Sequence, residues 1–312
     1  MTNSPAPPAV ACPCCLSSSA TLWLRTRPLS ASEPSYSLLR CESCTHVWLY
    51  PPLTAEQLAP FYDAVYHQAV THAGEGDAER WGRLRRIVEQ YKNGGAILDI
   101  GCSSGGFLSH LQGAAWQLAG IEASPDAAER ARQNTGGRIV TGDIATAQLP
   151  PGAFDVITCY DVLEHLHQPR VVFENVARWL RPGGIFYIFV PNILSWEARL
   201  FQSFWYPLDL PRHLHFFSPT SLNALAGVAG LRTVQIATPP GNYLENNVSR
   251  ILTWLARKAS GKQVWIDIGG PANLVARVMR KAIRLTIEDG FGVAASACHA
   301  APSLQAVFQK PQ

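Results

Sequence analysis

Two kinds of residue able to do chemistry are grouped along the chain: paired cysteines near the N-terminus, and carboxylates at the ends of apolar segments. The cysteines form two C-x2-C pairs, Cys12/Cys15 and Cys41/Cys44, separated by 25 residues. Each pair can place two thiolates on one small turn, and two such turns complete a tetrahedral zinc site with Zn–S distances of about 2.3 Å. Four thiolates close such a site, so we expect a zinc ion with a structural or docking role rather than a catalytic one. A disulfide pair or unused thiols are the alternative.

Two further residues beside these pairs could also bind a metal. Cys14 is a surplus thiol that could replace a neighbouring ligand. His46 is expected on the surface, because four cysteines already complete the site. Short strands predicted at 21–27 and 36–40, between the two pairs, are typical of a zinc ribbon.

The central candidate site is the segment AILDIGCSSGGFL at 96–108. Its apolar start predicts a buried parallel strand, and Gly101 and Gly105 then allow a tight turn that brings the backbone close to a ligand. The free amides of the following helix would face that ligand. Asp99 at the end of the strand would repel a pyrophosphate and suits a ligand that carries positive charge. A nicotinamide-binding turn would instead prefer glycine where Ser103 stands.

Two more acids follow predicted strands. Glu122 ends the second strand, 117–122, and lies 21 residues after Gly101. In nucleotide-binding α/β folds, an acid at this place accepts hydrogen bonds from ribose hydroxyls. Asp143 follows the third predicted strand, 138–141. An ordinary surface acid is the alternative interpretation of Glu122.

The pattern Asp-x-Gly-x-(Gly/Ser)-x-Gly resembles motif I of the class I S-adenosylmethionine-dependent methyltransferases, with Ser103 in place of the usual second glycine. The resemblance implies that this turn holds the methionine part of the cofactor. It also implies that Asp143 bonds the adenine amino group and that Ile144 packs on the ring. The cofactor contacts predicted in this stretch are Asp99, Gly101, Cys102, Ser103, Gly105, Phe107, Glu122, Ala123, Asp143, Ile144 and Tyr160.

The N-terminal part extends the resemblance. Bacterial methyltransferases with an N-terminal zinc ribbon often read C-x-x-C-G-h-x-h-x-x-P-x-P followed by Y-x-x-x-Y, and here His46 stands where that pattern has glycine. The resemblance implies that Tyr62 and Tyr66 lie over the cofactor pocket. Packing of aromatic side chains onto the main domain is the alternative.

The segment YDVLEHL at 160–166 directly follows the fourth predicted strand, 154–159. It resembles the D/E-x-L-E-H segment of small-molecule methyltransferases, including the ubiquinone-biosynthesis O-methyltransferases. Open α/β sheets place their chemistry at this end of their strands. If the segment is helical, Asp161, Glu164 and His165 share one face, which could contact cofactor or substrate, hold a divalent ion, or make only local hydrogen bonds. We predict substrate contacts from the two acids and a catalytic base in His165.

A second candidate substrate segment is WYPLDLPRHLHFFS at 205–218. It resembles the D-x-P-x-H-x-x-x-F-S loop of methyltransferases that act on sugars, quinones or polyketide-like products, and we expect it to cross the mouth of the pocket. His213 and His215 are further base candidates, with near-neutral pKa values in their ordinary state. Asp209 and Arg212 are predicted substrate contacts. A structural role is the alternative for each histidine.

The resemblance implies an α/β fold with a Rossmann-like seven-stranded methyltransferase sheet whose last strand, here 304–309, is antiparallel. A small zinc ribbon precedes this sheet, and a helical insertion precedes its last strand. The predicted parts are a disordered tail at 1–11, the zinc ribbon at 12–52, a helical linker or lid at 53–95, the methyltransferase core at 96–240 plus 303–312, and the helical insertion at 241–302.

The predicted insertion is basic, because eight Lys and Arg residues between 243 and 285 stand against Glu245 and Asp267. Its apolar residues recur at helical spacing, so it could be a substrate lid, a dimer arm or an interfacial helix pair. Peripheral membrane contact through 245–287 is therefore a hypothesis. Helices packed on the core with a solvated basic face are the alternative.

Composition excludes some classes of protein. The net charge of +3 is too small to indicate nucleic acid as a partner. No apolar run reaches the roughly 18 residues of a membrane-spanning helix. The N-terminus has neither the basic nor the apolar region of a secretory signal. We therefore expect a cytoplasmic protein, and the resemblance implies a small-molecule substrate.

The resemblance implies transfer of a methyl group from S-adenosylmethionine to a small biosynthetic intermediate such as a sugar or a quinone, most readily at a hydroxyl. An NAD-dependent oxidoreductase or epimerase is an alternative. Asp99 and the lack of a Tyr-x-x-x-Lys pair near the centre of the chain argue against it. A non-catalytic zinc-ribbon interaction protein with a decayed methyltransferase domain is a third hypothesis, and the intact set of acids argues against that one.

Overall fold

The computed structural model describes residues 10–26, 34–62, 77–113, 115–241, 243–261, 295–296, 298 and 300–312. The chain divides into two compact units. The ribbon unit comprises Met1–Leu53, Pro191–Ser221 and Ala237–Gln305, and the sheet unit comprises Thr54–Val190, Leu222–Ile236 and Ala306–Gln312. The ribbon unit thus draws on three separate stretches of sequence. The domain boundaries expected from the sequence remain a prediction.

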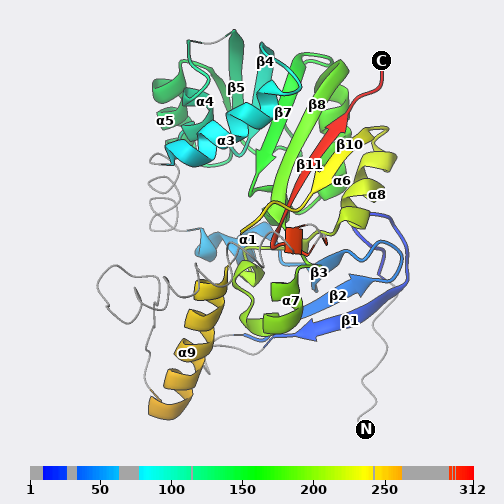
Figure 1. Cartoon of the computed structure of the whole chain (residues 1–312), viewed down its shortest axis with the longest axis vertical. Coiled ribbons are helices and arrows are strands. Elements are labelled where there is room, and N and C mark those ends of the chain that lie inside the picture. The colour runs from blue at the N-terminus through cyan, green and yellow to red at the C-terminus, as the bar shows by residue number, and fades with distance from the viewer. Residues whose placement is uncertain are drawn as a thin grey trace. The chain divides into compact units, whose positions relative to one another are not determined.

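The sheet unit is built on a seven-stranded sheet with the order β10-β11-β8-β7-β4-β5-β6 (Figure 1). Its strands are β4 (Gly95–Ile100), β5 (Trp116–Glu122), β6 (Arg138–Thr141), β7 (Phe154–Tyr160), β8 (Leu180–Pro191), β10 (Arg232–Ala237) and β11 (Ser303–Gln309). The central pairs β4–β5, β4–β7, β5–β6 and β7–β8 are parallel. The predicted seven-stranded methyltransferase sheet is confirmed.

The last strand runs against its neighbour, as predicted. The amide of Lys310 donates to the carbonyl of Gly184 at 3.0 Å, whereas the amide of Asn192 donates to the carbonyl of Pro302 at 2.8 Å. Residue numbers therefore rise along β8 while those of its partner fall, which is the register of an antiparallel pair.

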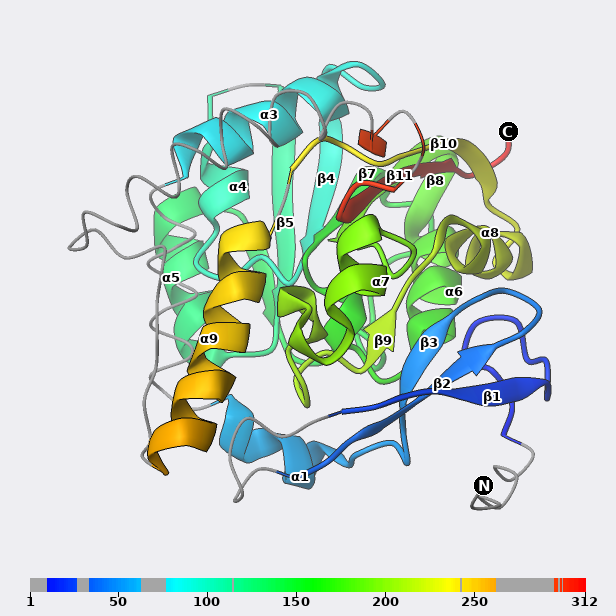
Figure 2. The ribbon, with the colours of Figure 1, turned by 60° about the horizontal axis from the view of Figure 1, so that its bottom comes forward.

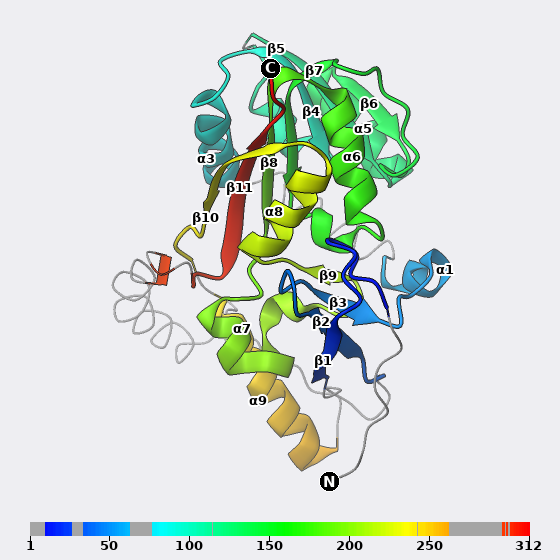
Figure 3. The same cartoon turned by 90° about the vertical axis from the view of Figure 1, so that its right-hand side faces the viewer.

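Helices cover both faces of this sheet (Figure 3). They are α3 (Ala78–Glu89), α4 (Gly106–Ser109), α5 (Pro125–Thr135), α6 (Pro169–Trp179) and α8 (Pro219–Val228). Leu84 of α3 and Phe107 of α4 join the core cluster that contains Tyr187 of β8. Side chains alternate along a strand, so Phe186 points to the opposite face, where Phe173 of α6 packs edge-on against it at 5.3 Å between ring centroids.

Local signals explain where these helices start and stop. Ser124 precedes α5, its hydroxyl accepts a hydrogen bond from the amide of Ala127, and proline occupies the first turn. Gly136 ends the helix with a φ of 64°, in the left-handed region that glycine reaches without strain.

The ribbon unit contains a four-stranded sheet of order β1-β2-β3-β9. Its strands are β1 (Ala20–Arg25), β2 (Ser37–Cys41), β3 (Val47–Tyr50) and β9 (His215–Phe216). Figure 2 shows β9 beside β3, and the pair is antiparallel, with Trp48 opposite His215. The first two strands overlap the short strands predicted at 21–27 and 36–40, whereas β3 was not predicted. The fourth corrects the expectation that 205–218 is wholly a loop, because a two-residue strand is too short to show alternation.

The described part of the ribbon unit also contains helices and 3₁₀ turns. It contains α7 (Trp196–Phe201), the 3₁₀ turns η3 (Gln202–Phe204) and η4 (Tyr206–Leu208), and α9 (Leu244–Ser260). Helix α9 confirms the first helix of the predicted insertion, whereas the second apolar repeat, at 274–284, lies outside the described residues. Among the described helices, none combines the length and apolar character needed to cross a lipid bilayer.

Candidate functional site

The turn between β4 and α4 requires glycine at two places. Gly101 has a φ of 70° and Gly105 a φ of 84°, both in the left-handed region. A Cβ at Gly101 would lie 2.4 Å from Val162 Cγ2, and one at Gly105 would lie 2.6 Å from Thr135 Cγ2. Backbone conformation and packing therefore both exclude larger side chains at these predicted cofactor contacts.

Ser103 lies in the same turn with a φ of 49°. Glycine suits this conformation best, which gives a physical reason for glycine in the pattern that the turn resembles. The serine amide donates a hydrogen bond to Glu122 Oε2 at 2.9 Å. This contact stabilises the turn in spite of the strained backbone.

Glu122 is held at the carboxyl end of β5, next to β4. Its second oxygen, Oε1, accepts a hydrogen bond from the amide of Ser124 at 2.8 Å. The two amide bonds orient the carboxylate, and each carboxylate oxygen has a further lone pair that can accept from a hydroxyl. The arrangement suits the predicted contact with a ribose.

Asp99 is the buried acid of the site, with 5% of its surface exposed. Its Oδ1 accepts a hydrogen bond from the hydroxyl of Thr158 on β7 at 2.6 Å. Burial raises the pKa of Asp99 to about 7; the Thr158 hydrogen bond opposes this shift, the charge of Glu122 adds to it, and Arg80 lowers the pKa. A cation bound beside Asp99 would favour its ionised form and so lower its pKa again.

The remaining predicted contacts on this edge differ in exposure. Asp143 is exposed after β6 and its Oδ1 accepts from the amide of Ala145 at 2.8 Å, while Ile144 is buried. Cys102 and Phe107 are buried in the apolar core, so their backbones are the parts that can face a ligand. Ala123 is exposed. All of these roles remain predictions.

Arg80 of α3 belongs to this region and escaped the sequence analysis. Its Nη2 lies 2.7 Å from Asp161 Oδ2, and its guanidinium carbon lies 4.2 Å from the ring centroid of Tyr160 and 4.7 Å from that of Trp81. Its Nε is buried and has no hydrogen-bond partner among the residues that the structure describes. Nothing in the sequence distinguishes it from Arg83 and its neighbours on the same helix.

The segment after β7 is less regular than predicted. Tyr160 stacks on Phe189 at 4.4 Å between ring centroids, and burial raises its pKa to about 12. Asp161 has a φ of 53° and lies before η2 (Leu163–His165), a 3₁₀ helix of one turn. Because Asp161 pairs with Arg80 outside this turn, the three side chains do not share one helical face, and that conditional expectation is corrected.

Within η2, Glu164 is 1% exposed and His165 is half-buried. Tyr62 places its hydroxyl 3.1 Å from His165 Nδ1. Tyr62 follows two short turns, α1 (Ala55–Leu58) and η1 (Ala59–Phe61), and Thr54 begins the first of them with a capping box. The predicted contact of Tyr62 with the cofactor stays untested, and Tyr66 lies outside the described residues.

In the second candidate segment, hydrogen bonds orient His213. Its Nδ1 lies 2.7 Å from the carbonyl oxygen of Pro207. A carbonyl only accepts, so Nδ1 carries the proton and Nε2 is the acceptor nitrogen of the neutral ring. Burial lowers the pKa of His213, although the charge of Asp209 opposes the shift. Arg212 donates from Nε and Nη2 to both oxygens of Asp209, at 2.9 and 2.6 Å, so these two predicted substrate contacts bind each other.

His215 is buried beside a second histidine. Its Nδ1 lies 3.0 Å from His46 Nε2, and the two rings stack at 5.2 Å between centroids. His46 is fully buried, and burial lowers its pKa to about 4. The expectation that His46 lies on the surface was wrong, because β9 covers it. These contacts favour a structural role for His215, and its catalytic role remains only a prediction.

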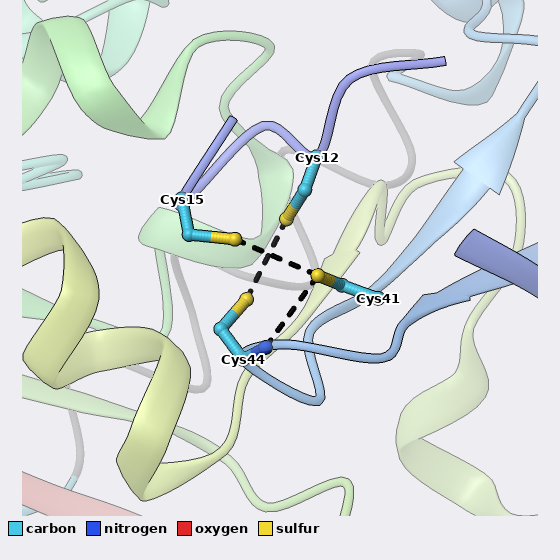
Figure 4. Close-up of side chains that lie close together, drawn as sticks. All are labelled: Cys12, Cys15, Cys41 and Cys44. Carbon is cyan, nitrogen blue, oxygen red and sulfur yellow. Dashed lines mark hydrogen bonds between the residues drawn. The ribbon is translucent and has the colours of Figure 1, made fainter. Parts of the chain in front are cut away.

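The four predicted metal ligands converge in the ribbon unit, as Figure 4 shows. The sulfur atoms of Cys12, Cys15, Cys41 and Cys44 all lie within 4.8 Å of one another, and the pairs Cys12/Cys44 and Cys15/Cys41 are each separated by 3.5 Å. A tetrahedral zinc–thiolate site requires sulfur–sulfur distances of about 3.8 Å. The cluster therefore fits zinc. Cys14 is buried outside it, and its amide donates to Cys12 Sγ at 3.4 Å.

Comparisons with known proteins agree with this geometry. Residues 77–236, more than half of the chain, match a family described as a methyltransferase domain. The ubiquinone biosynthesis O-methyltransferase of Thiobacillus denitrificans is 31% identical over 155 residues, which cover 46% of this chain and 67% of that protein. Its counterpart in Idiomarina loihiensis is 28% identical over 155 residues, covering 46% of this chain and 64% of the relative.

Solved structures share the fold. A SAM-dependent methyltransferase from Archaeoglobus fulgidus superposes with a TM-score of 0.51 at 20% identity, covering 78% of this chain and 100% of the other. The [4+2]-cyclase SpnF superposes with a TM-score of 0.50 at 17% identity, covering 83% and 96%. Because a cyclase has this fold too, the fold alone does not decide the reaction. The family match over more than half of the sequence decides the class of reaction. The chain belongs to the methyltransferase-domain family and is an S-adenosylmethionine-dependent methyltransferase.

Proposed function

We propose that this enzyme methylates a hydroxyl group of a small biosynthetic intermediate. The observation that supports the cofactor part of the proposal is the pair of carboxylates, Asp99 and Glu122, at the adjacent carboxyl ends of β4 and β5. They flank a turn in which Gly101, Ser103 and Gly105 all have left-handed backbone. Such a site repels a pyrophosphate and suits a cationic nucleoside. An oxidoreductase that binds NAD is therefore not favoured.

When bound, S-adenosylmethionine supplies an electrophilic methyl group on a sulfonium. The residues present fit it. Glu122 would accept from the ribose hydroxyls, and Asp143 would accept from the adenine amino group. Arg80, whose buried Nε has no partner in the described part of the chain, would bind the carboxylate of the methionine part. The carboxylate of Asp99 would attract the positive charge of the methionine part.

Proton removal from the acceptor is proposed for His165. This residue lies on η2, directly after the central strand β7, and so belongs to the same unit as the carboxylates. When its Nδ1–H donates to the oxygen of Tyr62, Nε2 becomes the nitrogen that can take a proton from a hydroxyl. In-line methyl transfer needs alignment of the nucleophile above all, and a positioned base adds to it.

The acceptor class follows from the relatives rather than from the geometry. They are named for O-methylation in ubiquinone biosynthesis, so phenolic hydroxyls such as those of catechols are the first acceptors to test. Sugars are the second class. Peripheral membrane contact through 245–287, the absence of a nucleic-acid partner and a cytoplasmic location all stay predictions.

Calorimetry with S-adenosylmethionine and with NAD tests the cofactor, and tighter binding of NAD would overturn the proposal. Incubation with methyl-labelled S-adenosylmethionine and a panel of catechols, hydroquinones and sugars tests the acceptor. We expect label in a phenolic methyl ether, which mild alkali does not cleave, whereas a methyl ester would release the label as methanol. Label found only on nitrogen or carbon would contradict hydroxyl methylation while leaving the enzyme class intact.

A further inference from the structure

The candidate substrate segment 205–218 ends on the zinc-binding part of the ribbon unit. Strand β9 pairs with β3, which begins three residues after Cys44, so that Val47 lies opposite Phe216. The amide of Leu49 also donates to the carbonyl of Leu214 at 2.9 Å. The end of the segment is thus a strand of the ribbon's own sheet.

The turn that presents two of the thiolates contacts the segment directly. The hydroxyl of Ser218 donates to the carbonyl oxygen of Cys44 at 3.1 Å and lies 2.7 Å from the hydroxyl of Thr45. Thr45 has a φ of 60°, and its amide donates to the carbonyl of Cys41 at 3.0 Å. The contact with Ser218 therefore depends on a tight, left-handed turn between and just beyond two metal ligands.

Buried rings complete this contact. His46 follows the turn, bonds His215 and lies 5.1 Å from the ring of Phe217 between centroids. The contact extends back along the segment, because Phe216 packs against Trp205 at 6.1 Å and against His213 at 6.3 Å between centroids. Trp205 is fully buried. A chain of packed side chains thus links the Cys41–Cys44 turn to the residues that precede β9.

We propose that the zinc-binding turns act as the positioning element of segment 205–218, so that zinc occupancy and the order of this segment are coupled. Because so small a sheet can bury little apolar surface, the metal–thiolate bonds have to hold its two turns together. Without them, the Cys41–Cys44 turn loses its closure and the carbonyl that Ser218 binds is no longer fixed. The consequence for acceptor binding rests on the proposed function, whereas the coupling itself does not.

Hydrogen exchange of the full-length protein, measured by mass spectrometry, tests the coupling. Zinc-loaded protein is compared with protein stripped by a chelator and with the Cys41→Ser variant, and the zinc content of each sample is measured by elemental analysis. We expect amide exchange in 205–218 to accelerate by about tenfold or more when zinc is lost. Peptides covering β4 and β5 serve as the internal reference and should not change. Unchanged exchange in 205–218 after zinc loss would overturn the proposal.

A second variant keeps the test decisive if metal removal unfolds the chain. Ser218→Ala removes the hydroxyl that binds the turn, together with the hydrogen bond that this hydroxyl accepts from the amide of Ser221. The variant should retain zinc, while exchange in 214–217, which lies before that second contact, accelerates. Ser43→Ala is the matched control, because Ser43 is exposed on the same turn and its hydroxyl donates to Ser17 rather than to the segment. Equal exchange in both variants would overturn the proposal. These measurements need no acceptor, so failure to find a methylated product would count against the proposed function alone.

Discussion

Burial strongly changes the pKa of one residue of the candidate site, Asp99. The acid lies near the end of β4 with 5% of its surface exposed, and burial raises its pKa to about 7. Near neutral pH the carboxyl group of Asp99 is therefore only partly ionised, whereas an ordinary aspartate is fully ionised there. A cationic ligand favours the ionised form, so binding and deprotonation are linked.

The affinity for S-adenosylmethionine should consequently depend on pH through Asp99. Below a pH of about 7 the free acid is protonated and binding must release that proton, so affinity falls as the pH falls through this value. Calorimetry between pH 6 and 8 should show a change of up to about tenfold in affinity, and Asp99→Asn should abolish this dependence and weaken binding by about tenfold or more.

Glu197 provides the control for that measurement. Burial raises its pKa to about 7 as well, but it belongs to the ribbon unit, where it accepts from the amide of Tyr243 and from Asn247. Glu197→Gln should leave the pH dependence of cofactor binding intact. A dependence that survives Asp99→Asn would show that another group is responsible.

His165 is predicted to be the base, and Tyr62 is then the residue that orients it. Tyr62→Phe removes the hydroxyl 3.1 Å from Nδ1 and should lower the rate of methyl transfer by about tenfold, with little change in cofactor affinity. Nitrogen-15 NMR of labelled histidine should show His165 with its proton on Nδ1, and a mixture of tautomers in the variant. An unchanged tautomer in Tyr62→Phe would argue against this role. Phe61→Leu, at the exposed neighbour, is the control.

At the scale of elements, the turn after β4 connects two parts of the site. Gly101 makes room for Val162, which begins the turn η2 that carries His165. The ion pair between Arg80 of α3 and Asp161 holds the same stretch from another side. The proposed cofactor turn and the proposed base, His165, are therefore positioned by one set of contacts within the sheet unit.

Gly101→Ala should disturb both. Its Cβ would lie 2.4 Å from Val162, so we expect a loss of about 2–4 kcal/mol in the free energy of unfolding and much weaker cofactor binding. Denaturant unfolding measures the first and calorimetry the second. Gly152→Ala has the same left-handed backbone with open space around it and should cost only about 1–2 kcal/mol. Val162→Ala added to Gly101→Ala should recover part of the loss; no recovery would refute the steric explanation.

At the scale of the whole molecule, the predicted metal ligands and the predicted cofactor contacts belong to different units. The four cysteines lie in the ribbon unit, whereas Asp99, Glu122, Asp143 and Arg80 all lie in the sheet unit. Each set can therefore be tested without the other.

Elemental analysis should give about one zinc ion per chain, and Cys41→Ser should lower it. Cys14→Ser should keep it, since this thiol lies outside the cluster. Chelation of zinc should change the affinity for S-adenosylmethionine by less than about twofold. The reason is that the predicted cofactor contacts between Asp99 and Tyr160 all lie in the sheet unit. Parallel loss of zinc and of cofactor affinity would contradict this separation.

Much of this arrangement could be predicted from the sequence because its signals are local. Apolar runs marked the parallel strands, Ser124 and Gly136 marked the ends of a helix, and the spacing of cysteines marked a metal site. The turn glycines and Asp99 are likewise read from neighbours in sequence. Strand burial, helix capping, tight turns and paired metal ligands each depend on residues close together in the chain, so each leaves a short sequence pattern.

Only the tertiary structure decided what depends on residues far apart in the chain. It buried His46 under His215, turned 215–216 into a strand of the ribbon, and set Arg80 against Asp161. It also replaced the expected helical face at 161–165 by one 3₁₀ turn. These contacts join segments about 80 to 170 residues apart, and no local pattern encodes them, because either partner alone reads as an ordinary surface or loop residue.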